Sequence, residues 1–139
     1  MPMLIEHIDR IARMKQRDVV YLTFASDWMD FDRTWETDEN HPRNIITKFF
    51  DENDIKWTMC ADPASENGFS AYQGQIYIDV PYDVTNPEYI KVQQFLEDEN
   101  ENIKPEFGST HFYYVPLSLA LTNAHHDEPG FWEKWAETF

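Results

Sequence analysis

The segment 75–80, Gln-Ile-Tyr-Ile-Asp-Val, alternates polar and apolar side chains more regularly than any other part of the chain. This period of two is typical of a strand that buries one face. Residues 18–24, 55–61 and 110–115 show weaker forms of the same pattern. Four such segments favour a sheet, because each strand must pair with a neighbour and bury its apolar face.

Two helical segments are predicted between these strands. Pro42 is expected to open the first helix, which ends at Asn53-Asp54, since proline suits the first helical turn. Asn86 and Pro87 supply the N-cap and first turn of the second helix, which is expected to run to about Asp98. The order of these elements is therefore β-α-β-β-α-β.

Additional helices are predicted outside this unit, at residues 3–16, 117–124 and 129–139. The expected fold class is α+β: a ferredoxin-like β-α-β-β-α-β four-stranded antiparallel sheet with added N-terminal and C-terminal helices. The two central helices would cover one sheet face. The other face would be open, except where the terminal helices covered part of it. We expect residues 1–139 to form a single acidic α+β domain.

The formal net charge is −15, and it is unevenly placed. Residues 1–17 hold four basic and two acidic residues, a net of +2, so residues 18–139 carry −17. A field of this sign repels nucleic acid and anionic membranes and attracts basic protein surfaces. Direct nucleic-acid binding and membrane association are therefore not expected. The alternative is that the acidity serves solubility or adaptation to a salty cytoplasm.

The single cysteine, Cys60, cannot form a disulfide within the chain, which is typical of a reducing compartment. No secretory signal is recognised near Met1, and the apolar stretches are too short to span a membrane. These features predict a cytoplasmic protein.

The order of elements and the acidity together are similar to those of the small acidic ferredoxin-like proteins that inhibit ribonucleases in bacteria. The resemblance is one of organisation, without a shared residue motif. It implies a protein that binds and inhibits a partner, and it transfers no functional residue to this sequence.

The segment 26–41 combines aromatic and acidic residues in one long connection. Connections of this length without regular structure are often functional. Aromatic anchors surrounded by charge suit a basic protein target. The candidate partner-binding residues are Asp27, Trp28, Asp30, Phe31, Asp32, Trp35, Glu36, Asp38 and Glu39. The alternative is that one or two of these rings fill the edge of the core.

No catalytic residue, metal site or cofactor is predicted. Adjacent His125 and His126 do not have the helical spacing that brings two histidines to one metal ion. Cys60 lacks an evident basic neighbourhood that would lower its pKa and make it a nucleophile. With four glycines, a phosphate-binding loop is not expected either.

The sequence therefore predicts a non-enzymatic acidic protein that binds and modulates or inhibits a basic protein partner, of the inhibitor, immunity, antitoxin or polyanion-mimic type. The first alternative is a small enzyme or ligand-binding domain with a pocket between the open sheet face and the terminal helices. Its candidate residues are Tyr21, Cys60, Tyr77, Asp79 and His111. The second alternative is a homodimer formed through the surplus aromatic residues.

Overall fold

The computed structural model of the chain describes residues 6–24, 34–61, 63 and 72–137. Its centre is one antiparallel sheet with the spatial strand order β2-β3-β1-β4. The strands are β1 (Val19–Thr23), β2 (Trp57–Met59), β3 (Ile76–Ile78) and β4 (His111–Val115). The predicted α+β class and the four-stranded antiparallel sheet are confirmed.

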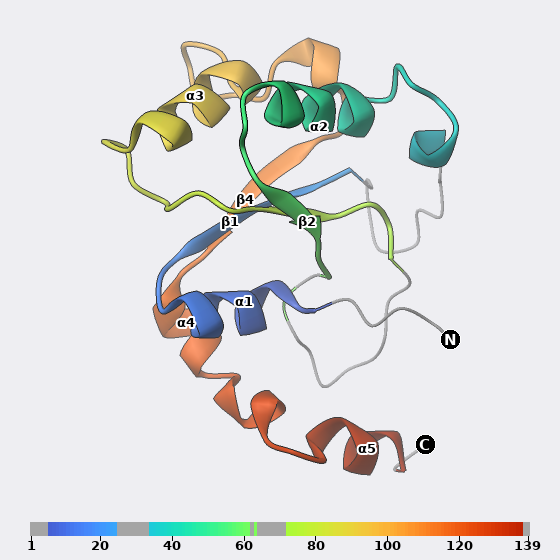
Figure 1. Cartoon of the computed structure of the whole chain (residues 1–139), viewed down its shortest axis with the longest axis vertical. Coiled ribbons are helices and arrows are strands. Elements are labelled where there is room, and N and C mark those ends of the chain that lie inside the picture. Colours follow the sequence, from blue (N-terminus) through green and yellow to red (C-terminus); the bar gives the residue numbers. More distant parts are fainter. Residues whose placement is uncertain (1–5, 25–33, 62, 64–71, 138–139) are drawn as a thin grey trace.

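Helices lie on both faces of this sheet (Figure 1). On one face lie α2 (Pro42–Glu52) and α3 (Pro87–Leu96), and on the other lie α1 (Ile8–Lys15) and α4 (Leu117–Leu121). The last helix, α5 (Phe131–Ala136), lies beyond α4 at the end of the molecule away from α2 and α3 (Figure 1). Three short 3-10 turns complete the described chain: η1 (Thr34–Glu36), η2 (Pro105–Phe107) and η3 (Ala124–Asp127).

The first core lies between the sheet and the α2–α3 layer. Alternate side chains of β1 and β3 enter this core, and Val20, Leu22, Ile76 and Ile78 are fully or almost fully buried. The helices contribute apolar side chains at helical spacing, and these are Ile46, Phe50, Tyr89, Val92 and Leu96. Asn86 caps α3 as predicted, because its side chain accepts from the backbone N–H groups of Glu88 and Tyr89.

A second core lies on the opposite sheet face, where the terminal helices cover the strands. Tyr21 and Tyr77 are register partners on β1 and β3, and both are buried there beside Cys60. α1 supplies Ile8, Ile11 and Ala12, and α4 supplies Ala120. The face that the alternation pattern left open is therefore packed, because α1 turns an apolar stripe toward it.

A buried polar cluster joins α1 to the C-terminal segment. The guanidinium of Arg13 donates to both carboxylate oxygens of Asp127, to the backbone oxygen of Ala120 and lies 3.7 Å from Asp9. Asn123 donates from its side chain to Asp9 at 2.8 Å. A buried guanidinium is tolerated only when it is paired and hydrogen-bonded, and these contacts provide that pairing.

Several element boundaries differ from the predicted ones. α1 begins at Ile8 rather than residue 3, because the chain just before it pairs with Ala61: Ile8 N–H donates to the oxygen of Ala61, and Ala61 N–H donates to that of Glu6. β2 has three residues, and α3 ends at Leu96. Within the described ranges, no helix is long and apolar enough to cross a membrane.

Candidate functional site

The acidic and aromatic segment predicted to bind a partner is described in part. Residues 25–33 lie outside the described ranges, so five of the nine candidates, Asp27, Trp28, Asp30, Phe31 and Asp32, have no structural description. The other four, Trp35, Glu36, Asp38 and Glu39, lie in η1 and in the turn that leads into α2.

Trp35 is half-buried against neighbouring side chains rather than fully presented to solvent. The guanidinium carbon of Arg43 lies 4.3 Å from the centre of the indole, a cation–π contact. The ring of Tyr72 meets the indole edge-on at 5.7 Å. Arg43 also donates to the backbone oxygen of Gly74 at 2.9 Å. The interpretation that one ring of this segment fills the edge of the core fits Trp35.

The three acidic residues that follow Trp35 are exposed to solvent. Asp38 holds the turn into α2, because its carboxylate accepts from the backbone N–H of Asn40 and its backbone oxygen accepts from the side chain of Asn44. His41 then caps α2, accepting from the backbone N–H of Arg43. Glu36, Asp38 and Glu39 are therefore presented on a stable turn beside α2.

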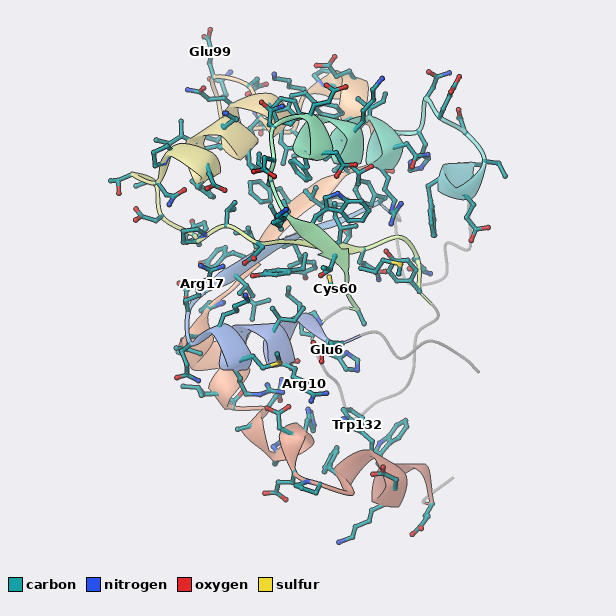
Figure 2. The ribbon with its side chains drawn as sticks, viewed as in Figure 1. Glu6, Arg10, Arg17, Cys60, Glu99 and Trp132 are labelled. Carbon is teal, nitrogen blue, oxygen red and sulfur yellow. The ribbon has the colours of Figure 1, made fainter. Side chains whose placement is uncertain are left out.

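Negative charge is concentrated on the α2–α3 side of the molecule. Residues 34–54 hold six acidic and two basic residues, a net of −4, and residues 82–107 hold seven acidic residues and two lysines, a net of −5. Residues 6–18 and 116–137, which form the side with α1, α4 and α5, hold seven acidic and five basic residues, a net of −2. Glu99 projects from the end of the molecule opposite Trp132 (Figure 2). The two helical layers thus differ in electrostatic character.

The basic residues of α1 and of the turn after it are engaged in ion pairs. Arg10 lies 3.8 Å from Glu6, Arg13 binds Asp127, and both Lys15 and Arg17 contact Asp79. These pairs compensate charge locally on the α1 side. Among the described residues of α3 and the turn after it, no ion pair compensates the acidic run 97–101 in the same way.

A groove of about 220 Å³ opens at the edge of the molecule between α3 and β4. Aromatic rings from three segments line it. Tyr82 and Tyr114 are stacked at 4.6 Å and are both well exposed, and Tyr82 also meets Tyr89 edge-on at 5.4 Å. Phe112 lies 6.3 Å from Tyr89, measured between ring centres. Sequence analysis did not predict this groove.

Two carboxylates, those of Glu97 and Glu101, line the same groove. Burial raises the pKa of Glu97 above its ordinary value. A hydrogen bond from the side chain of Gln93 opposes this rise, and the charges of Glu101 and Asp98 add to it. Burial also raises the pKa of Tyr89, with additional contributions from Tyr82, Glu97 and Glu101. The groove therefore combines aromatic rings with two carboxylates, and partial burial makes the charged form of one of them, Glu97, less favourable.

Three of the five residues proposed for an enzyme or ligand pocket, Tyr21, Cys60 and Tyr77, are buried together in the second core. Cys60 is completely buried in the second core, on the side of β2 toward α1 (Figure 2). Tyr77 donates to Asp79 at 2.8 Å, and burial raises the pKa of Tyr77 to about 12. His111 is exposed on β4, where its ring stacks on that of Tyr113.

The histidine pair near the C-terminal helix has an aromatic environment. His126 is buried, with its ring 4.7 Å from Phe131 and 5.0 Å from Trp132. Trp132 also stacks on His7, which links α5 to the start of α1. In the part of the chain that the structure describes, no three His, Cys, Asp or Glu side chains are grouped so that they could hold a metal ion.

Comparison with protein-family models, with curated proteins and with solved structures finds no match to this chain.

Proposed function

We propose that this chain is a non-enzymatic acidic protein that binds a basic protein partner and modulates or inhibits it. The observation that carries the proposal is the separation of charge between the two helical layers. The segments 34–54 and 82–107 on the α2–α3 side together carry −9, whereas residues 6–18 and 116–137 on the side with α1, α4 and α5 together carry −2. A surface with this uncompensated charge attracts and orients a basic protein.

The proposed contact surface begins at the turn before α2. Glu36, Asp38 and Glu39 are exposed there, and Asp27, Trp28, Asp30, Phe31 and Asp32 belong to the same proposed surface by sequence. Trp35 contributes mainly by fixing the turn against Arg43. In this proposal the carboxylates steer the partner during its approach, while aromatic side chains provide the anchors.

We also propose that the fold is ferredoxin-like. The order of β1, α2, β2, β3, α3 and β4 along the chain supports this, as does the spatial strand order β2-β3-β1-β4 with antiparallel neighbours. α1, α4 and α5 would then be additions to that unit. The second core under α1 leaves the α2–α3 side and the sheet edges as the surfaces for a partner.

The proposal is tested by capturing proteins from a lysate of the source organism with three forms of the chain. The first is wild type, the second is Glu36→Gln/Asp38→Asn/Glu39→Gln, and the third is Glu128→Gln/Glu133→Gln/Glu137→Gln. The last two lose the same number of charges from opposite ends of the molecule. We expect the same basic protein to be retained by wild type and by the third form, and to be lost from the second and at high salt.

The association rate of that protein is then measured as a function of salt concentration. Electrostatic steering predicts a slower association and a flatter salt dependence for the Glu36→Gln/Asp38→Asn/Glu39→Gln variant. Equal loss of binding in both triple variants would show a nonspecific charge effect and contradict the proposed surface. Absence of any specifically retained basic protein would contradict the proposed function itself.

A further inference from the structure

The groove between α3 and β4 has features that suit a cation. Its walls include the exposed rings of Tyr82 and Tyr114, which belong to segments about thirty residues apart in sequence and are stacked in parallel at 4.6 Å. The faces of aromatic rings are electron-rich and attract cations. Glu97 and Glu101 line the same groove and add carboxylates that can accept hydrogen bonds from a bound cation.

The end of α3 strengthens this electrostatic preference. A helix carries partial negative charge at its C-terminus, and a basic residue in the last turn usually compensates it. The last turn of α3 contains no basic residue, and the acidic residues Glu97, Asp98 and Glu99 follow directly. The ammonium of Lys104 lies 5.9 Å from the centre of the ring of Phe95. Neither Lys104 nor Phe95 lines the groove.

The burial of Glu97 is consistent with a site that is completed by a ligand. The pKa of Glu97 is raised mainly by burial, which means that its charged form is less favourable in the folded protein than in the unfolded chain, although a hydrogen bond from Gln93 opposes this effect. A cation in the groove would stabilise that charged form. Residues with perturbed pKa values are common at binding sites, where a charged group can favour ligand binding while lowering the stability of the free protein.

The size of the groove limits what it can take. Its volume of about 220 Å³ is below the roughly 300–1,000 Å³ of clefts that enclose drug-sized ligands. It therefore suits the end of one side chain better than a cofactor. Because β4 is an edge strand, the rest of a partner would lie outside the sheet without a clash with another strand of the described chain.

We infer that this groove receives an arginine side chain of the basic partner, an inference that rests on the proposed function and adds a second contact to it. Arginine fits better than lysine because its planar guanidinium can stack on a tyrosine face while its edge donates two hydrogen bonds to a carboxylate. Because the rings of Tyr82 and Tyr114 stack on each other, the guanidinium takes an outer face of this pair, and Glu97 and Glu101 supply the acceptors.

The test is an NMR titration of the full chain with N-acetyl-arginine amide and, in parallel, with N-acetyl-lysine amide. We expect the arginine compound to shift the signals of Tyr82, Tyr114, Glu97 and Glu101, and to bind more tightly than the lysine compound. Glu97→Gln/Glu101→Gln should weaken arginine binding by about tenfold or more, because charge-assisted hydrogen bonds are lost. Tyr114→Leu keeps apolar bulk without the aromatic face and should weaken it about two- to fivefold.

The matched control is Glu88→Gln/Glu106→Gln, which removes the same charge from exposed positions on the same side of the molecule. Unchanged arginine binding in this control, with loss in Glu97→Gln/Glu101→Gln, supports the inference. Shifts spread over the acidic surface, equal weakening in both double variants, or equal binding of arginine and lysine compounds would each overturn it.

The two proposals fail in different ways. If the captured basic protein depends on Glu36 and Asp38 while the arginine compound does not bind the groove, the further inference is wrong and the proposed function stands. If no basic protein is captured but the arginine compound binds the groove selectively, the groove is a cation site and its assignment to a protein partner is wrong.

Discussion

The guanidinium of Arg13 holds both carboxylate oxygens of Asp127, at 2.6 Å from Nε and 2.7 Å from Nη2, across 114 residues of sequence. Arg13 is buried, whereas the side chain of Asp127 is 35% exposed. This bidentate pair fixes the segment after α4 against α1, and with it the layer that covers the second sheet face.

Replacing Asp127 with asparagine should lower the free energy of unfolding by about 1.5–3 kcal/mol, since a charge-assisted pair is lost and the buried guanidinium loses a partner. Urea unfolding monitored by tryptophan fluorescence measures the change. Glu128→Gln is the matched control on an exposed neighbour and should stay within about 0.5 kcal/mol of wild type. Equal stability of the two variants would show that the pair is energetically neutral.

The same pair should determine part of the acid sensitivity. The hydrogen bond from Arg13 lowers the pKa of Asp127 below its ordinary value of 3.8. A depressed pKa in the folded state contributes stability that is present above the unfolded value and is lost as the pH falls through the folded one. Asp127→Asn should therefore show a shallower loss of stability below about pH 4. An unchanged acid profile would contradict this origin.

Substitution of Gly74 by alanine should destabilise the turn that supports Trp35. Gly74 has φ +96°, and a Cβ atom there would lie 3.1 Å from Nε1 of Trp35 and 3.3 Å from Cδ of Arg43. Backbone strain of this kind costs about 1–3 kcal/mol, and crowding adds to it. Gly130→Ala is the control, because Gly130 has φ +84° with no atom within 4 Å of the added Cβ. Thermal unfolding should rank Gly74→Ala as the less stable variant, and the reverse order would contradict the steric explanation.

Replacing Glu97 with glutamine should stabilise the free protein at neutral pH. Burial raises the pKa of Glu97, so folding disfavours its charged form. The gain should be present above the raised pKa and should vanish as the pH falls below the unfolded value, where the wild-type carboxyl is also protonated. Melting temperatures at neutral and acidic pH measure it, with exposed Glu99→Gln as control. A less stable Glu97→Gln at neutral pH would show that the carboxylate is already compensated.

Alkaline stability should report on Tyr77. Burial raises the pKa of Tyr77 from 10.0 to about 12, so the folded protein keeps a proton that the unfolded chain releases. The resulting stability is complete below pH 10 and is lost as the pH rises from 10 toward 12. Tyr77→Phe should flatten this alkaline slope in urea unfolding experiments. If Tyr77→Phe lost stability with rising pH as steeply as wild type, a group other than Tyr77 would be responsible for the alkaline loss of stability.

The strands and the central helices could be predicted because their signals are local. The alternation of polar and apolar residues in 75–80 predicts β3. Asn86 and Pro87 predict the start of α3, and the helix begins at Pro87. The packing of the second sheet face could not be predicted in the same way. Tyr21 and Tyr77 occupy the alternate positions that usually face solvent, and only the approach of α1 and α4, distant from each other in sequence, buries them.

Candidate residues could be selected from the sequence only where they were neighbours along the chain. The acidic segment around Glu36 and Asp38 is visible in the sequence as a composition bias, and in its described part Glu36, Asp38 and Glu39 are exposed whereas Trp35 is half-buried. The α3–β4 groove draws on Tyr82, Glu97 and Tyr114, which no short motif connects. The acidic run after α3 was visible in the sequence, but its proximity to tyrosines depends on β4 lying at the sheet edge.

The contacts of Arg13 with Ala120 and Asp127 also have a consequence for biosynthesis. Arg13 meets Ala120 and Asp127, which are 107 and 114 residues later, so this layer cannot close on the ribosome until almost all of the described chain has been made. Contacts of such high sequence separation form slowly. The nascent chain therefore cannot complete the packing around α1 until the segment that holds Ala120 and Asp127 has been made, and a chaperone would be needed most before that point.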